Sequence, residues 1–196
     1  MDTTARTSLS RTPLPLPRCG RCGFTSRPYD RQRAPALLLE YAGRWQRVLA
    51  RTGVMRRCGG MPAWSPLEHG CHVRDMCLLL HRRIDALLGT APPAAPPPGG
   101  PELPPRYRDE DARQVSVELC WAAKALAGRL AALTADDWER EDPRLPDLRP
   151  TVAFLTRHFL HEVFHNLSEV SHGARDGEPV AAVRRGTGWK AAGGRG

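Results

Sequence analysis

Histidines are concentrated in one short segment of the 196-residue chain. His158, His161 and His165 follow one another at spacings of three and four residues, which place them on one stripe of an α-helix. Neutral imidazoles that converge from successive turns are suitable ligands for a divalent metal ion, whereas a single histidine is more often a bonded residue at the edge of a core. Three on one stripe therefore favour metal binding over a purely structural role.

The histidine stripe adjoins an apolar stripe of the same helix. Phe154, Ser168 and His172 extend the histidine stripe in both directions. The neighbouring apolar stripe consists of Val152, Leu155, Phe159, Val163 and Val170. A helix that is apolar on adjacent faces is largely buried, so we expect the histidines to face protein rather than bulk water.

A third imidazole has to come from a facing helix. The segment from Ser65 to Leu88 contains His69 and His72. Helical periodicity places His69 in the middle of an apolar stripe and His72 one step round it, which favours burial of His69 but leaves open which of the two is a ligand. Asp75, one turn after His72, could accept a hydrogen bond from a metal-binding imidazole, or it could be an ordinary surface carboxylate.

A second metal-binding pattern lies near the N-terminus. Cys19 and Cys22 form a C-x-x-C-G sequence typical of half a zinc ribbon, in which a tight turn presents two thiolates to one metal. A closed structural zinc site needs two more ligands, and no second C-x-x-C occurs. Cys58 could supply one and a histidine the other. A redox-active pair is the alternative, although the βαβ pattern that supports one is missing.

Four amphipathic segments must position these residues. Periodicity predicts four helices, over about 34–52, 65–88, 109–133 and 151–172. The second begins at Ser65-Pro66, with Glu68 placed for a capping box, and ends at Gly89; the fourth ends at Gly173. Strand patterns are nearly absent. The expected fold is therefore all-α.

The arrangement of these helices along the chain predicts one domain, a four-helix bundle over residues 31–175. A proline-rich crossover connects its second and third helices (89–106). A flexible leader that contains the cysteine turn precedes the bundle (1–30), and a disordered tail follows it (176–196).

Composition excludes several classes of protein. The 29 Lys+Arg and 21 Asp+Glu give a net charge of +8, but the positive residues are dispersed, so no specific nucleic-acid interface is expected. No apolar run approaches the roughly 18 residues of a membrane span, and no secretory signal is recognisable. We therefore expect a cytoplasmic protein with reduced cysteines and no membrane contact.

Two segments resemble the DinB-like superfamily of metalloenzymes: W-S-P-L-E-H-G-C-H-V-R-D from Trp64 to Asp75, and H-E-V-F-H-N-L from His161 onward. The resemblance implies a four-helix bundle that holds a divalent ion, zinc or nickel, through His72, His161 and His165, with open positions for substrate. The resemblance therefore favours His72 over His69 as the third metal ligand. Characterised relatives include mycothiol-dependent maleylpyruvate isomerases and thiol S-transferases, which activate a low-molecular-weight thiol at the metal.

These patterns lead to the hypothesis of a metal-dependent thiol S-transferase or isomerase that acts on small molecules. Mycothiol is one low-molecular-weight thiol that it could use, and a homodimer is one assembly that it could form. His69, His158 and Glu162 are expected to line its pocket. The alternative is a non-catalytic, metal-stabilised binding or stress-response module. A zinc metallohydrolase with Glu162 as the base of H-E-x-x-H is less favoured, because the longer protease motif does not continue and no β-rich lobe is expected.

Overall fold

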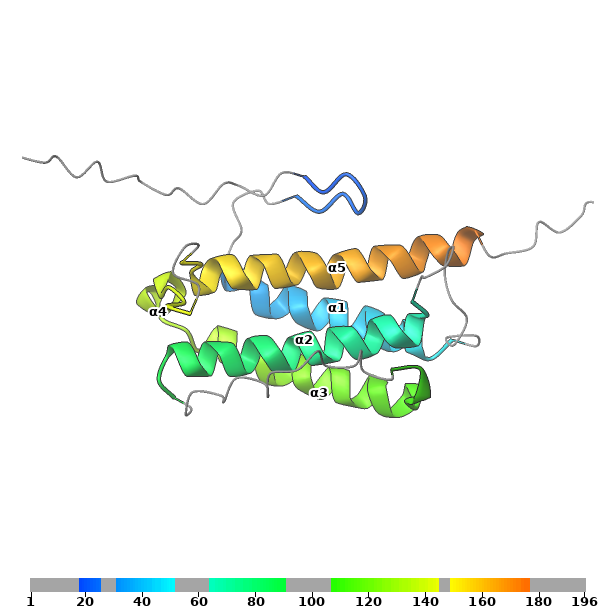
Figure 1. Ribbon diagram of the computed structural model, residues 1–196, viewed down its shortest axis with the longest axis horizontal. Helices are drawn as coiled ribbons and strands as arrows, with labels where there is room; N and C mark the ends of the chain where they lie inside the picture. Colours follow the sequence, from blue (N-terminus) through cyan, green and yellow to red (C-terminus); the bar gives the residue numbers. More distant parts are fainter. Residues whose placement is uncertain (1–17, 26–30, 52–63, 91–106, 145–148, 177–196) are drawn as a thin grey trace, which may run out of the picture.

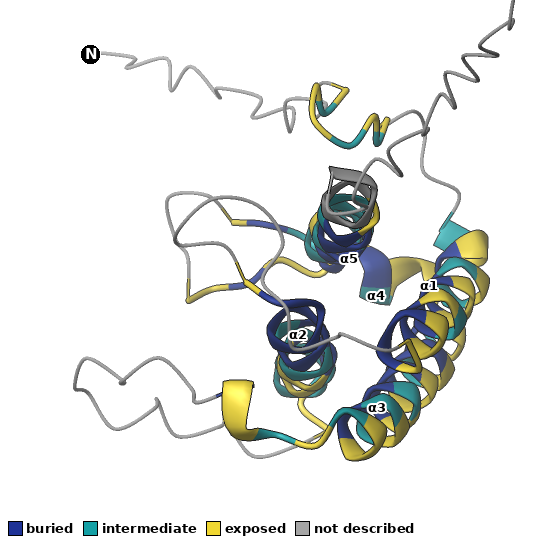
Figure 2. Ribbon diagram, turned by 90° about the vertical axis from the view of Figure 1, so that its right-hand side faces the viewer, coloured by how far each residue is buried: buried dark blue, intermediate teal, exposed yellow. Residues whose placement is uncertain are grey.

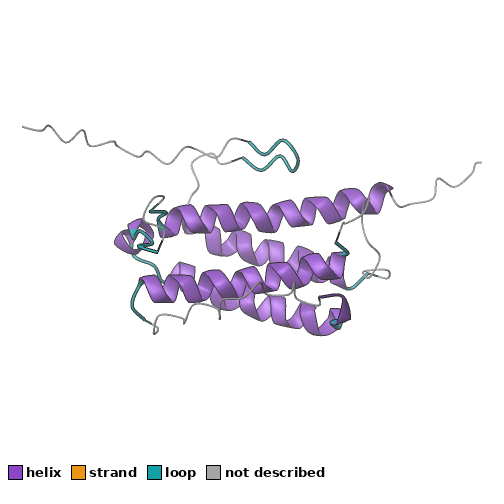
Figure 3. Ribbon diagram, viewed as in Figure 1, coloured by secondary structure: helices purple, strands orange, loops and turns teal. Residues whose placement is uncertain are grey.

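The described part of the chain consists of helices and connecting turns. This computed structural model describes residues 18–25, 31–51, 64–90, 107–144 and 149–176, with the side chains of the last helix described through Ser171. The elements are η1 (Arg31–Arg33), α1 (Ala34–Leu49), α2 (Pro66–Leu87), η2 (Tyr107–Asp109), α3 (Ala112–Ala131), α4 (Ala135–Glu139) and α5 (Val152–Asp176) (Figure 1). Within these ranges no strand forms (Figure 3), and the predicted all-α class is confirmed.

Local sequence explains where the helices begin and end. At the start of α2, the Ser65 side chain accepts from the backbone N–H of Glu68, whose carboxylate accepts from the backbone N–H of Ser65. Gly89 follows the helix with a φ of +68°, a left-handed conformation that glycine adopts without strain. The predicted ends of this helix are thus confirmed. The predicted end of the last helix at Gly173 is wrong, because α5 continues to Asp176; an interior glycine costs a helix only about 1 kcal/mol.

The five helices pack together around one core. α3 packs against α1 and α2, α5 packs against the same two helices from the other side, and the short α4 packs against α5. The buried faces of the long helices turn toward one another, while the exposed residues of α1 and α3 face outward (Figure 2). The largest fully buried side chains include Leu38, Trp45, Leu67, Ile84, Leu119, Leu126, Leu130 and Leu160.

The connection between α4 and α5 is held by a buried carboxylate. Asp142 has no exposed side-chain surface and accepts hydrogen bonds from Arg83 of α2 and from Arg144. Its own backbone N–H donates to the carbonyl of Pro150, just before α5. Burial alone would raise the pKa of Asp142, but the hydrogen bonds from Arg144 and Arg83 outweigh it and lower that pKa to about 2. These bonds set where α5 begins relative to α2.

The N-terminal turn, residues 18–25, lies on the outside of the helices beside α5 (Figures 1 and 2). Phe24 packs against the core at its edge, with its ring stacked on His161 at a centroid distance of 5.0 Å. Arg21 forms an ion pair with Glu169 of α5. The predicted tails, most of the proline-rich crossover and Cys58 lie outside the described residues. None of the described helices combines the length and apolar character that crossing a membrane requires.

Candidate metal centre

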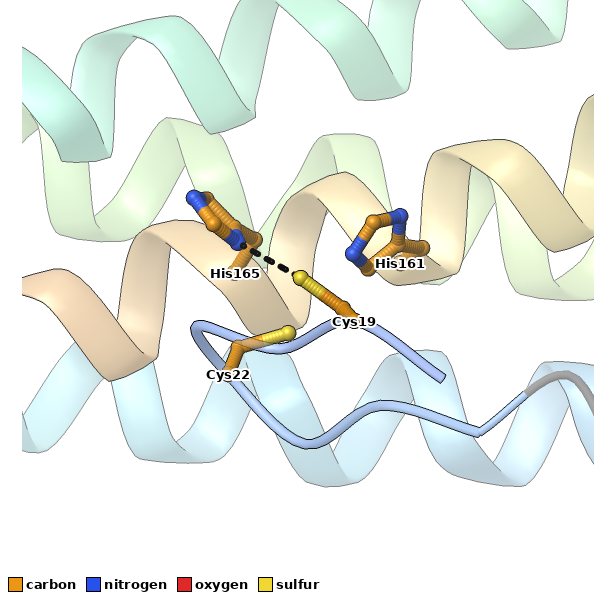
Figure 4. Close-up of side chains that lie close together, drawn as sticks. All are labelled: Cys19, Cys22, His161 and His165. Carbon is orange, nitrogen blue, oxygen red and sulfur yellow. Dashed lines mark hydrogen bonds between the residues drawn. The ribbon is translucent and has the colours of Figure 1, made fainter. Parts of the chain in front are cut away.

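Four side chains from opposite ends of the chain meet at one point on the surface of α5. Cys19, Cys22, His161 and His165 each offer a ligand atom, and these four atoms all lie within 4.8 Å of one another. The thiols come from the N-terminal turn and the imidazoles from successive turns of α5, and the side chains point toward one another (Figure 4). The group is close enough to hold a metal ion.

The cysteine turn is folded by its own backbone bonds. The N–H of Gly23 donates to the carbonyl of Cys19, and the N–H of Cys19 donates to the carbonyl of Phe24. Gly23 has a φ of +75°, which a residue with a side chain rarely adopts and which explains the glycine after C-x-x-C. The turn therefore holds both sulfur atoms on one side, as a zinc-binding turn requires.

The same turn makes one of the thiols acidic. The backbone N–H of Cys22 donates to the sulfur of Cys19, and together with the neighbouring His161 ring and the N–H of Arg21 it lowers the pKa of Cys19 to about 6. Burial raises the pKa of Cys22, and the nearby Cys19 thiolate raises it further. Cys19 is thus a thiolate at neutral pH, which is the form that binds metal.

Each of the two histidines directs one ring nitrogen at this turn. Nε2 of His161 is buried and has no hydrogen-bond partner among the described residues, an arrangement that costs energy unless something else binds there. Nδ1 of His165 lies 3.7 Å from Sγ of Cys19. Sulfur and nitrogen ligands of a tetrahedral zinc ion lie about 3.5 Å apart, so this spacing fits a shared metal.

The histidine stripe of α5 faces protein, as expected, at His161 and His165, but not at His158. His161 and His165 each expose 19% of the side chain, and they face the N-terminal turn. His158 is exposed and stacks on the ring of Phe154. The adjacent apolar stripe occupies the core instead, with Val152, Phe159, Val163 and Val170 buried as predicted. His172 lies beyond the described side chains.

The histidines of α2 occupy a separate place. His69 is buried as the periodicity predicts, and its Nδ1 lies 2.6 Å from Oδ1 of Asn166 on α5. His72 is half-buried against the ring of Trp64, and burial lowers its pKa. It is not among the four clustered residues, so the set of His72 with His161 and His165 stays a prediction.

Two acidic residues named in the sequence analysis, Asp75 and Glu162, lie outside the cluster. Asp75 accepts from the hydroxyl of Tyr107 and from Arg74, rather than from an imidazole. Glu162 projects from α5 with its carboxylate 4.0 Å from Nδ1 of His161. Neither therefore contributes a donor to the described cluster.

Three contributors to the cluster were not predicted: Arg21, Phe24 and Glu169. Glu169 accepts a hydrogen bond from Nε2 of His165 at 3.1 Å. Its spacing of four residues after His165 is a signal that the sequence carries, because such pairs meet on a helix surface. The contacts of Arg21 and Phe24 depend on the tertiary approach of the turn and have no such local signal.

Two thiols and two imidazoles are the donor set of closed, tetrahedral zinc sites. All four donors come from the protein, so a tetrahedral ion bound here would have no position left for water or substrate. Comparison with known proteins finds no family model, no curated protein and no solved structure that matches the chain.

Proposed function

We propose that this protein binds one zinc ion through Cys19, Cys22, His161 and His165, and that the ion fastens the N-terminal turn to the helices. The observation that carries the proposal is the convergence of four donor atoms within 4.8 Å. The unpartnered Nε2 of His161 and the acidic thiol of Cys19 support it.

The donor chemistry favours zinc over other common ions. Thiolates are soft ligands that bind zinc far better than calcium or magnesium, and a tetrahedral arrangement of two sulfurs and two nitrogens is typical of zinc. Nickel is the second ion to consider, but its typical square-planar sites use nitrogen and oxygen ligands, whereas this cluster offers two sulfurs and two nitrogens. We therefore assign zinc as the resident ion.

A site with four protein ligands supports a non-catalytic, metal-stabilised module. Catalytic zinc sites keep an open position, which Lewis-acid chemistry or thiol activation needs. The ion would instead stabilise the folded arrangement of two segments that the sequence keeps far apart, because binding free energy at such a site is also folding free energy.

A DinB-like four-helix bundle with thiol S-transferase or isomerase activity is the second candidate. Its support is the arrangement of four long helices, with His161 and His165 on the last one, as that resemblance implies. It requires His72 as the third ligand and an open position in place of the cysteines. Loss of metal from a His72→Ala variant, with retention by Cys19→Ser, would favour this candidate.

Cobalt substitution tests the proposed site. Co²⁺ replaces Zn²⁺ in such centres and reports its ligands through its absorption spectrum, in which thiolate ligands give an intense ultraviolet charge-transfer band and tetrahedral geometry gives strong visible bands. We expect one Co²⁺ per chain with both features, displaced by zinc. The double variant Cys19→Ser, Cys22→Ser should lose the charge-transfer band while circular dichroism shows unchanged helix content. A spectrum without thiolate bands in the native chain would refute the proposal.

A further inference from the structure

Glu169 contacts three different segments at the edge of the metal centre. Its Oε1 lies 3.1 Å from Nε2 of His165 and 3.1 Å from the guanidinium of Arg21, and its Oε2 lies 4.0 Å from Nε2 of His69. We infer that Glu169 is the positioning residue of the zinc site: it holds the Nε2–H of His165 so that Nδ1 binds the metal. This inference rests on the proposed function.

The hydrogen bond decides which nitrogen of His165 is available. A carboxylate only accepts hydrogen bonds, so the Nε2 that faces Glu169 carries the proton. A neutral imidazole has one protonated nitrogen, which leaves the lone pair on Nδ1. Nδ1 is also the atom that faces Sγ of Cys19, at 3.7 Å. Carboxylates that orient metal-binding histidines in this way raise the basicity of the ligand.

The two histidines would then bind the metal through different nitrogens. His161 has its unpartnered, buried nitrogen at Nε2, and Glu162 lies 4.0 Å from its Nδ1. His165 has the opposite arrangement, with Nε2 bonded and Nδ1 facing the turn. The structure thus assigns Nε2 coordination to His161 and Nδ1 coordination to His165.

Glu169 also fixes the cysteine turn. Arg21 lies between the two cysteines, and its side chain is 79% exposed, so the ion pair contributes little free energy by itself. Its effect is geometric. Oε1 of Glu169 both accepts from His165 and pairs with Arg21, so one atom positions the imidazole and the cysteine turn relative to each other.

The second oxygen of Glu169 faces α2. His69 is buried, and its Nδ1 donates to Oδ1 of Asn166, whose own amide donates to the carbonyl of Glu162 at 2.8 Å. The donor role of that amide settles which atom of Asn166 is the oxygen. The ring of His69 is therefore fixed in orientation, and it directs Nε2 at Glu169. Because Nδ1 is the donor, Nε2 of the neutral ring carries a lone pair and does not donate to the carboxylate, so the described hydrogen-bonding partners of Glu169 are His165 and Arg21.

The test combines zinc affinity with the protonation pattern of His165. Two-bond ¹H–¹⁵N spectra of the zinc-loaded full chain distinguish the two ring nitrogens, and we expect His165 to be metal-bound at Nδ1 and protonated at Nε2. Competition with a chelator should show that Glu169→Ala weakens zinc binding by about 10-fold to 100-fold. Glu169→Gln should retain part of the affinity, because its amide oxygen still accepts from Nε2. Glu40→Ala, which removes an exposed carboxylate paired with Arg44, is the control and should bind zinc like the native chain.

The outcomes separate this inference from the proposed function. A native chain that binds no zinc overturns the proposed function and the inference together. A native chain that binds one zinc, with His165 metal-bound at Nε2 or with unchanged affinity in Glu169→Ala, overturns the inference alone. If Glu169→Ala does not fold, Glu169→Gln is the deciding variant. Zinc binding by Glu169→Gln as tight as in the native chain, together with coordination of His165 through Nε2, would contradict the assigned role.

Discussion

Sγ of Cys19 lies 3.7 Å from Nδ1 of His165, although 146 residues separate them in the chain. The contact joins the N-terminal turn to the last helix. It also brings the two metal-binding sequence patterns, C-x-x-C and H-x-x-x-H, into one group of four donors. Each pattern alone provides two ligand atoms, and together they provide the four that the proposed zinc ion requires.

The acidity of Cys19 predicts its reactivity in the metal-free protein. The thiolate is the nucleophile, and the pKa of Cys19 is lowered to about 6 from an ordinary value of 9.0. In zinc-free protein, the rate of alkylation of Cys19 by iodoacetamide should therefore rise with pH around a midpoint near 6. Cys22, whose pKa is raised, should react only at higher pH. Mass spectrometry of peptides from a pH series measures both rates.

Zinc and the neighbouring ring should change this profile in defined ways. Added zinc should protect both thiols from alkylation. His161→Ala should move the midpoint of Cys19 upward only in part, because the backbone N–H of Cys22 is the larger cause of its acidity. A midpoint near 9 for Cys19 in the native sequence would contradict the described hydrogen bonds.

Removal of the metal should lower stability without unfolding the helices. The core is built from side chains of the helices themselves, and the proposed zinc site lies at its edge. Zinc at about 100-fold above its Kd would add about 2.7 kcal/mol, which corresponds to a Tm increase of about 5–11 °C for a chain of this size. Chelation should reverse that increase and leave the far-ultraviolet circular dichroism at 25 °C unchanged. Loss of helix on chelation would show that the metal supports the whole fold.

Asp142 should make the protein sensitive to acid. Its folded pKa of about 2 lies below its ordinary value of 3.8, so its contribution to stability is complete above pH 3.8 and is lost as the pH falls through about 2. Asp142→Asn should reduce the free energy of unfolding at pH 7 by about 2 kcal/mol, since two arginines lose their charged acceptor. Urea titrations from pH 2 to 7 should show the difference between the two proteins shrinking toward the acid end. A difference in unfolding free energy that stays constant with pH would show that the substitution acts through the shape of the side chain rather than through its charge.

Trp45 should tolerate phenylalanine but not alanine. Its side chain is fully buried, and its Nε1–H has no hydrogen-bond partner among the described residues. Trp45→Phe loses apolar contact but also removes that unsatisfied donor, so the two effects offset each other to within about 1 kcal/mol. Trp45→Ala should cost about 3–5 kcal/mol because it leaves a cavity. Urea unfolding of both variants checks this, and equal losses would contradict the role of the unpaired N–H.

The helices could be predicted because their signals are local. The Ser65–Glu68 capping box, the glycine at position 89 and the apolar periodicity each depend on residues within a few turns. The end of α5 could not be predicted, since a glycine at position 173 is compatible both with termination and with continuation.

The parts of the candidate site could be predicted separately from the sequence, but their convergence could not. Spacing predicts Cys19 with Cys22 as a ligand pair, with a histidine as one further ligand, and places His158, His161 and His165 on one helical stripe. The choice of His161 and His165 from that stripe comes from the family resemblance. Nothing in the spacing shows which segment covers a helix face, so the sequence predicts that the histidine stripe faces protein but not which part of the protein. The structure places the N-terminal turn there.

Zinc content of purified variants, measured by inductively coupled plasma mass spectrometry after dialysis, tests the central claim most directly. The native chain, His72→Ala and His81→Ala should each retain one zinc per chain. His81 pairs with Asp85 on α2 and serves as the matched control. Most of the zinc should be lost in the variants Cys19→Ser, His161→Ala and His165→Ala. Zinc retained by Cys19→Ser but lost by His72→Ala would contradict the four-residue site.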